Sequence, residues 1–217
     1  MLETDIIPFV KIAVALFVLV NPLEGIPVFM VRSRHLDAAG RLSTARTAAI
    51  AVTIIMLVAL YLGRVLLAGF GISVGAFMVA GGVLIFLIGV RMVFGMTAGG
   101  RDDAADPGEN FAIVPLAIPL LAGPGVISGV IVYATKGPRG TGCTAADDLL
   151  LTAIILAVGT ATWLALRAAD PLRRLLGDTG IDVSTRVSGL IVAAIAVEMI
   201  HTGLVDLFPA LATAAAS

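Results

Sequence analysis

The chain has 217 residues, of which 59% are hydrophobic and only 13% are charged, whereas a soluble domain carries roughly 25% charged residues. Its net charge is −1 and no basic cluster stands beside aromatic residues, so nucleic acid is not an expected partner. The mean hydropathy of +1.07 predicts a polytopic protein of the lipid bilayer.

Six apolar runs have the length of about 20 residues that a bilayer-spanning helix requires. They predict spans at 6–31, 44–66, 73–93, 111–135, 149–166 and 187–207. The first run has no A-x-A-like cleavage site, so we expect it to remain as a membrane helix and not to be removed as a signal peptide. The predicted fold is an all-α membrane protein with six transmembrane helices.

Basic residues are distributed unevenly between the two sides that these spans define. The loops after the first, third and fifth spans hold ten of them, and the opposite side holds four. The positive-inside rule therefore predicts that the ten face the cytoplasm and that both termini lie outside. The ten are Arg32, Arg34, Arg41, Arg46, Arg91, Arg101, Arg167, Arg173, Arg174 and Arg186; the four are Lys11, Arg64, Lys136 and Arg139.

Proline-containing segments interrupt the first and fourth runs, with N-P-L-E-G-I-P at 21–27 and P-L-L-A-G-P-G at 119–125. Proline removes a backbone donor and clashes with the preceding turn, and the freed groups need partners in protein or in a watered cavity. Breaks in corresponding places of two chain halves are typical of the substrate site of a secondary transporter. The alternative is that each proline only kinks a helix to improve packing.

In the first break, Pro22 and Pro27 flank Gly25, a pattern that predicts unwinding of more than one turn. Unpaired amides at a half-helix N-terminus suit a carboxylate, and exposed carbonyls suit an ammonium. Asn21 adds a side-chain amide at the same place. Glu24 either belongs to the site or extends toward the cytoplasmic face.

The second break is formed by Gly123, Pro124 and Gly125, which offer backbone groups and no polar side chain. Ser128 supplies a hydroxyl one turn later. The spacing of Gly125 and Gly129 is a small-xxx-small pattern, which favours helix contact for Gly129.

Glu24 and Glu198 are the acidic residues in the interior of the predicted spans, with Asp206 marking the end of the last one, and an ionisable group inside a span is a functional candidate. Either could carry a coupling proton or sodium ion, while Glu198 could instead pair with Arg91 or face an outer water crevice. Glu198 and His201 have the Glu-x-x-His spacing of helical metal sites, but the only other histidine is His35. We therefore expect no metal site and no cofactor.

Cys143 is the only cysteine, which excludes an intramolecular disulfide, and it has no neighbouring base. No nucleophile–base arrangement is evident, so an enzyme is not expected.

A partial internal repeat divides the chain near its middle. Phe9 precedes Pro22 by thirteen residues, as Phe111 precedes Pro124, and the flexible loop 97–110 separates the two halves. Three spans in each half imply that the second half enters the membrane from the opposite side. We expect inverted three-helix repeats at 1–104 and 105–217.

Four segments together resemble the MarC family of bacterial and archaeal membrane proteins, which includes transporters of small neutral amino acids. They are N-P at 21–22 with P-V-F at 27–29, G-G-V-L-I-F-L-I-G at 81–89, P-L-L-A-G-P-G at 119–125, and G-L-I-V-A-A-I-A-V at 189–197. The resemblance covers nearly the whole chain. It implies six spans in two inverted halves in the inner membrane.

The resemblance further implies transport of glycine, alanine and similar small amino acids, driven by a proton or sodium gradient. One departure is that Glu24 stands where family sequences often have glycine, with the glycine at position 25. A carrier or exporter of another small solute, a channel and a non-transporting membrane protein stay open as alternatives. Association into a homo-oligomer also stays open.

Overall fold

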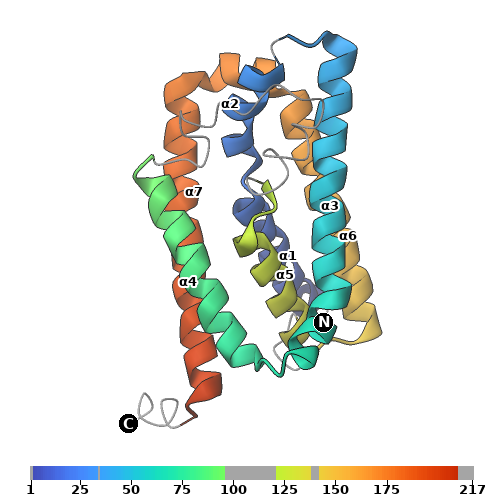
Figure 1. The fold of residues 1–217 in the computed structure, drawn as a ribbon, viewed down its shortest axis with the longest axis vertical. Helices are drawn as coiled ribbons and strands as arrows, with labels where there is room; N and C mark the ends of the chain where they lie inside the picture. Colours follow the sequence, from blue (N-terminus) through green and yellow to red (C-terminus); the bar gives the residue numbers. More distant parts are fainter. Residues whose placement is uncertain (1, 34, 96–120, 138–141, 210–217) are drawn as a thin grey trace.

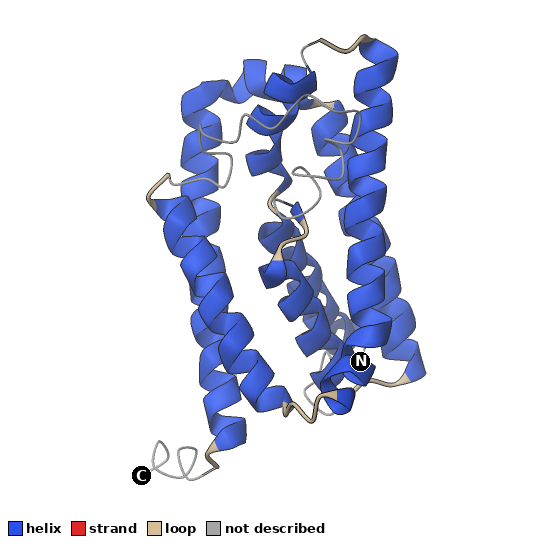
Figure 2. Cartoon of the chain, in the orientation of Figure 1, coloured by secondary structure: helices blue, strands red, loops and turns tan. Residues whose placement is uncertain are grey.

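The structure, a computed structural model, describes residues 2–33, 35–95, 121–137 and 142–209. In this part of the chain it contains helices and loops and no strand, as Figure 2 shows. The helices in chain order are α1 (Leu2–Val20), α2 (Pro22–Ser33), α3 (Ala38–Gly69), α4 (Val74–Val93), α5 (Pro124–Lys136), α6 (Ala145–Arg167) and α7 (Ala169–Leu207).

Within the described residues, five helical segments are long and apolar enough to cross a membrane. They are Ile7–Met30, Ala38–Gly69, Val74–Val93, Ala145–Arg167 and Thr179–Leu207. Each overlaps one of the six predicted spans. The remaining prediction, 111–135, overlaps α5, but residues 111–120 lie outside the described part of the chain.

Helix α7 begins well before the predicted start at residue 187 and is not a single straight rod. Gly177 has φ 66° and ψ 172°, which separates a short first segment from the long one. Charged residues such as Arg174 and Asp182 excluded this part from the apolar run. The helix extends beyond the apolar run into the polar region. Hydropathy determines only which part of a helix is compatible with lipid, and the backbone hydrogen bonds can continue past that part.

The helices pack in three groups, which Figure 1 shows side by side. Helices α4 and α7 pack together along one side, α3 and α6 pack together along the other, and α1, α2 and α5 lie between the two pairs. The main core joins the central helices to α3 and α6, with Leu16, Ile26 and Met56 almost fully buried. A second cluster lies on α4 and α7 and includes Ile85.

Helices α4 and α7 approach closely because small residues recur at seven-residue intervals on both. A methyl group built at Gly89 would lie 2.8 Å from the carbonyl oxygen of Gly189. Small residues that let backbones approach are the usual basis of helix association in a membrane. The contacts pair Gly75 with Gly203, Gly82 with Ala196 and Gly89 with Gly189.

Ion pairs join helices at both ends of the bundle. At the end of the bundle that contains the loop between α3 and α4, Arg64 Nη2 lies 2.6 Å from Asp148 Oδ1. At the opposite end, Arg41 Nη1 lies 3.2 Å from Asp170 Oδ2. The start of α1 and the end of α7 lie at the Arg64 end (Figure 1). The start of α1 and the end of α7 thus share one side of the bundle. That this side faces outward remains a prediction from the distribution of basic residues.

Candidate functional site

The break in the first span occupies a single residue, Asn21. Its amide still donates to the carbonyl of Phe17 at 3.0 Å, which closes α1, and its own carbonyl accepts from the amide of Glu24 at 3.1 Å, which opens α2. Its φ of 42° is in the left-handed region, which asparagine tolerates better than most residues. Pro22 is the first residue of α2, where its missing N–H costs no helical hydrogen bond.

The extent of this break is smaller than the proline spacing predicted. Helix α2 runs continuously from Pro22 to Ser33 through Pro27, so unwinding over more than one turn is wrong for this conformation. The helix lacks one donor at Pro27, and its remaining bonds and buried neighbours such as Ile26 hold it together.

The Asn21 side chain is held inside the protein by Glu24. Asn21 is 5% exposed, and its Nδ2 donates to Glu24 Oε2 at 3.2 Å. Glu24 is the third residue of α2, where a carboxylate also interacts favourably with the positive end of the helix. The Glu24 carboxylate therefore orients the amide at the break.

The second break is built from backbone alone. Gly123 is buried and extended, with φ −68° and ψ 176°, and it provides no side-chain cap to α5. Pro124 is the first residue of that helix, and the first helical bond runs from the amide of Ile127 to the carbonyl of Gly123 at 3.2 Å. Helix geometry leaves the amides of Gly125 and Val126 without an intrahelical acceptor. This end of α5 is suited to an anionic group.

The two breaks meet in the middle of the bundle. A methyl group built at Gly25 would lie 3.1 Å from Cδ2 of Leu121, a fully buried residue just before the second break. A methyl group at Gly129 would lie 3.0 Å from Cδ1 of Leu19, just before the first. From this contact, α2 runs to one end of the bundle and α5 to the other (Figure 1). Two proline-initiated half-helices thus begin side by side and diverge.

Two of the predicted site residues on α5 contact α4. A methyl group built at Gly125 would lie 3.1 Å from Cγ1 of Ile85 on α4. A methyl group built at Gly81 on α4 would lie 2.7 Å from Cβ of Ser128. Ser128 is 5% exposed. The small size of Gly125 and Ser128 therefore allows α5 to pack against α4 in this conformation. Of these two residues, only Gly125 offers a group suited to a ligand, its backbone amide.

Glu198 lines a groove between α1, α4, α5 and α7 that has a volume of about 510 Å³. Lys11 and Tyr133 line the same groove, and so do Leu19 and Gly129 beside the breaks. The groove thus extends from the level of Lys11 and Thr202, on the side of the bundle that is predicted to face outward, to the level of the breaks. In the sequence, Lys11 stands out only as one cation of the predicted outer side, because nothing in the sequence shows that α1 faces α7.

The suggested pairing of Glu198 with Arg91 is wrong. Gly82 packs against Ala196 and Gly89 against Gly189, and this antiparallel register places Arg91 level with residue 187. At 1.5 Å per residue, Glu198 is roughly 16 Å farther along the axis.

Comparisons with known proteins agree on one group of membrane proteins. A family model described as MarC family integral membrane protein matches residues 7–208. The UPF0056 membrane protein YhcE of Escherichia coli K12 is 36% identical over 208 residues, which cover 94% of each chain. The UPF0056 inner membrane protein MarC of Escherichia coli SMS-3-5 is 31% identical over 206 residues, or 89% of this chain and 92% of the relative. No solved structure matches.

Proposed function

Since the chain belongs to the MarC family of integral membrane proteins, we propose that it is a secondary transporter of small neutral amino acids and not an enzyme. Glycine and alanine would bind between the two helix breaks and cross by alternating access, coupled to protons or sodium. Its location would be the cytoplasmic (inner) membrane, with the basic end of the bundle in the cytoplasm.

The observation that carries this proposal is the buried meeting of the two breaks. An amino acid is a zwitterion, and the amides at the start of α5 suit its carboxylate. The side-chain carbonyl oxygen of Asn21 and the Glu24 carboxylate suit its ammonium. A binding position here involves Asn21, Pro22, Glu24, Gly25, Pro27, Gly123, Pro124, Gly125 and Ser128 as binding or positioning residues.

The size of the contact favours the smallest amino acids. Gly25 and Leu121 touch, so a ligand must separate α2 from the residues before α5 in order to bind. Each additional methylene requires a larger separation in a close-packed interior. Glycine and alanine require the smallest displacement, whereas a leucine or phenylalanine side chain would displace the buried Leu121.

The pairing of helices supports two inverted halves. One half consists of α1–α2, α3 and α4, and the other consists of α5, α6 and α7. Helix α3 of the first half packs against α6 of the second, α4 packs against α7, and the broken segments meet at the centre. The half-helices α2 and α5 point in opposite directions, as an inverted relation requires. The boundary at 104/105 lies outside the described residues. Rocking of one half against the other would open the central contact alternately to each side.

Glu24 and Glu198 are the coupling candidates, and their positions differ. Glu24 lies at the break and bonds to Asn21, so loading it with a proton or sodium ion would act directly on the substrate position. Glu198 lies in the groove with Lys11, so it would act on the outer approach.

Uptake of radiolabelled glycine and alanine into proteoliposomes, with an imposed proton or sodium gradient, tests the proposal. We expect saturable, gradient-driven uptake that is lost in Asn21→Gly, which accepts the left-handed backbone but lacks the amide. Gly69→Ala is the control, because a methyl group there meets nothing within 4 Å, and it should transport normally. A folded, inserted protein that takes up neither amino acid contradicts the substrate assignment.

Two further variants identify the coupling residue. Replacing the coupling carboxylate in Glu24→Gln or Glu198→Gln should abolish gradient-driven accumulation. Glu198→Gln should preserve exchange of labelled for unlabelled substrate, whereas Glu24→Gln should also weaken exchange, because Glu24 lies at the substrate position. If both variants accumulate substrate as the wild type does, neither carboxylate carries the ion.

A further inference from the structure

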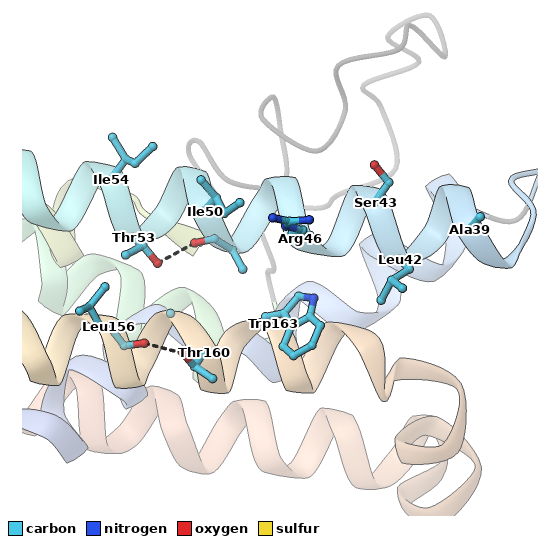
Figure 3. Close-up of a pocket in the computed structure, with 12 residues that line it drawn as sticks. Ala39, Leu42, Ser43, Arg46, Ile50, Thr53, Ile54, Leu156, Thr160 and Trp163 are labelled. Atoms are coloured by element: carbon cyan, nitrogen blue, oxygen red, sulfur yellow. Dashed lines mark hydrogen bonds between the residues drawn. The ribbon is translucent and has the colours of Figure 1, made fainter.

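A second groove, distant from the breaks, lies between α3 and α6 toward the basic end of the bundle. Its volume is about 780 Å³. One face of α3 and one face of α6 form its walls, as Figure 3 shows. The α3 face contributes Arg46, Ile50 and Ile54, and the α6 face contributes Leu156, Thr160 and Trp163.

Most of this groove is apolar, since the hydroxyls of Thr53 and Thr160 donate to backbone carbonyls of their own helices. Arg46 and Trp163 lie toward one end of it. Trp163 is partly buried, and its Nε1 has no hydrogen-bond partner among the described residues. Figure 3 shows the indole nitrogen on the side of the ring that faces α3, the helix that carries Arg46. A buried N–H without an acceptor costs free energy, so an acceptor entering from outside the protein would remove that cost.

Arg46 differs from the other two arginines of α3. Arg41 pairs with Asp170 and Arg64 pairs with Asp148, each across to another helix. Over the described part of the chain, no carboxylate lies within 4 Å of Arg46. Its guanidinium is therefore available for an anion at the mouth of the groove.

The length of the groove matches one membrane leaflet. Arg46 and Ile54 are separated by eight residues, which corresponds to roughly 12 Å along α3. Half of the hydrocarbon core of a bilayer is about 15 Å thick. A phosphate beside Arg46 would therefore place an attached acyl chain along Ile50 and Ile54 toward the membrane centre.

We propose that this groove binds one phospholipid with an anionic headgroup in the leaflet at the basic end of the bundle. The phosphate binds Arg46, a headgroup or ester oxygen accepts from Trp163 Nε1, and one acyl chain lies between the exposed faces of α3 and α6. Basic pockets between membrane helices on the cytoplasmic side are known to bind anionic lipid headgroups. The proposal does not depend on what the protein transports.

The test is lipid retention by the full-length protein in detergent, measured by native mass spectrometry with added phosphatidylglycerol or phosphatidylcholine. We expect one phosphatidylglycerol to be retained more strongly than phosphatidylcholine. Its apparent affinity should fall about fivefold in Arg46→Gln and about threefold in Trp163→Phe. Arg174→Gln, which removes an exposed arginine outside the groove, is the matched control and should retain lipid like the wild type.

A third variant, Thr160→Trp, fills the groove while leaving Arg46 in place and should also lower retention. Equal retention of both lipids would overturn the proposal, as would unchanged retention in both Arg46→Gln and Thr160→Trp. Displacement of the lipid by millimolar inorganic phosphate would show a site for a free anion and would also overturn it.

Discussion

The close approach of α4 and α7 makes Gly89→Ala a sharp test of the structure. Gly89 faces Gly189 and Ala193 on α7, and a methyl group there would lie 2.8 Å from the Gly189 carbonyl oxygen and 2.8 Å from the Ala193 amide nitrogen. Both neighbours are backbone atoms, which cannot rotate away as a side chain can. The two helices must therefore separate to accept the methyl group.

The expected cost follows from two opposing effects. Alanine favours a helix over glycine by about 1 kcal/mol, whereas forcing a methyl group into a close-packed interface costs about 1–3 kcal/mol. The separation also loosens the contact between Gly82 and Ala196, because both glycines of α4 lie in the same row. We expect the higher part of that range to apply, so that Gly89→Ala lowers stability by about 1–2 kcal/mol net.

The measurement is thermal unfolding in detergent, with Gly69→Ala as the matched control. Gly69 is also helical, but a methyl group there meets nothing within 4 Å, so only the helix preference operates and stability should rise by up to about 1 kcal/mol. Using roughly 2–4 °C per kcal/mol for a chain of this length, Gly89→Ala should melt about 2–8 °C below the wild type. A Gly89→Ala protein as stable as Gly69→Ala would refute the packing of α4 on α7.

Three other predictions concern the first break, the charge network and the orientation. Because Asn21 has φ 42°, Asn21→Ala should be about 1 kcal/mol less stable than Asn21→Gly; equal melting temperatures would argue against the left-handed conformation. A double-mutant cycle with Arg64→Gln and Asp148→Asn should give a coupling of about 1 kcal/mol, since the 2.6 Å pair is only partly exposed; additive single effects would show that the pair contributes nothing. A membrane-impermeant maleimide should label Cys143 in intact cells. Burial, and after it the charge of Asp148, raises the pKa of the Cys143 thiol, so the thiolate fraction and the labelling rate should keep rising from about pH 7 to about pH 9. Labelling only after permeabilisation would reverse the predicted orientation.

Much of the architecture could be predicted from the sequence because lipid imposes strong local constraints. Apolar runs with few or no charges predicted five helical segments now described, and Pro22 and Pro124 predicted the places where α2 and α5 begin. These features depend on hydropathy and on the missing proline donor, both of which are properties of the local chain.

Other features depend on which helix lies beside which, and no local signal carries that information. The antiparallel register of α4 and α7 excludes the pairing of Arg91 with Glu198 and brings Glu198 into one groove with Lys11. The role of Glu24 is local, since it bonds to Asn21 three residues away, but it depends on the left-handed turn at the break, which the sequence did not predict.

By itself, the sequence determined that this is a polytopic helical membrane protein, where its apolar helices lie and where two of them are interrupted. Only the tertiary structure decided that the interruptions meet, that Gly25 contacts Leu121 there, and that Gly125 and Ser128 are small in order to pack against α4. The physical reason is one of range. Hydropathy and backbone geometry act within one or two helical turns, whereas the meeting of the breaks depends on complementary small residues on helices far apart in the chain.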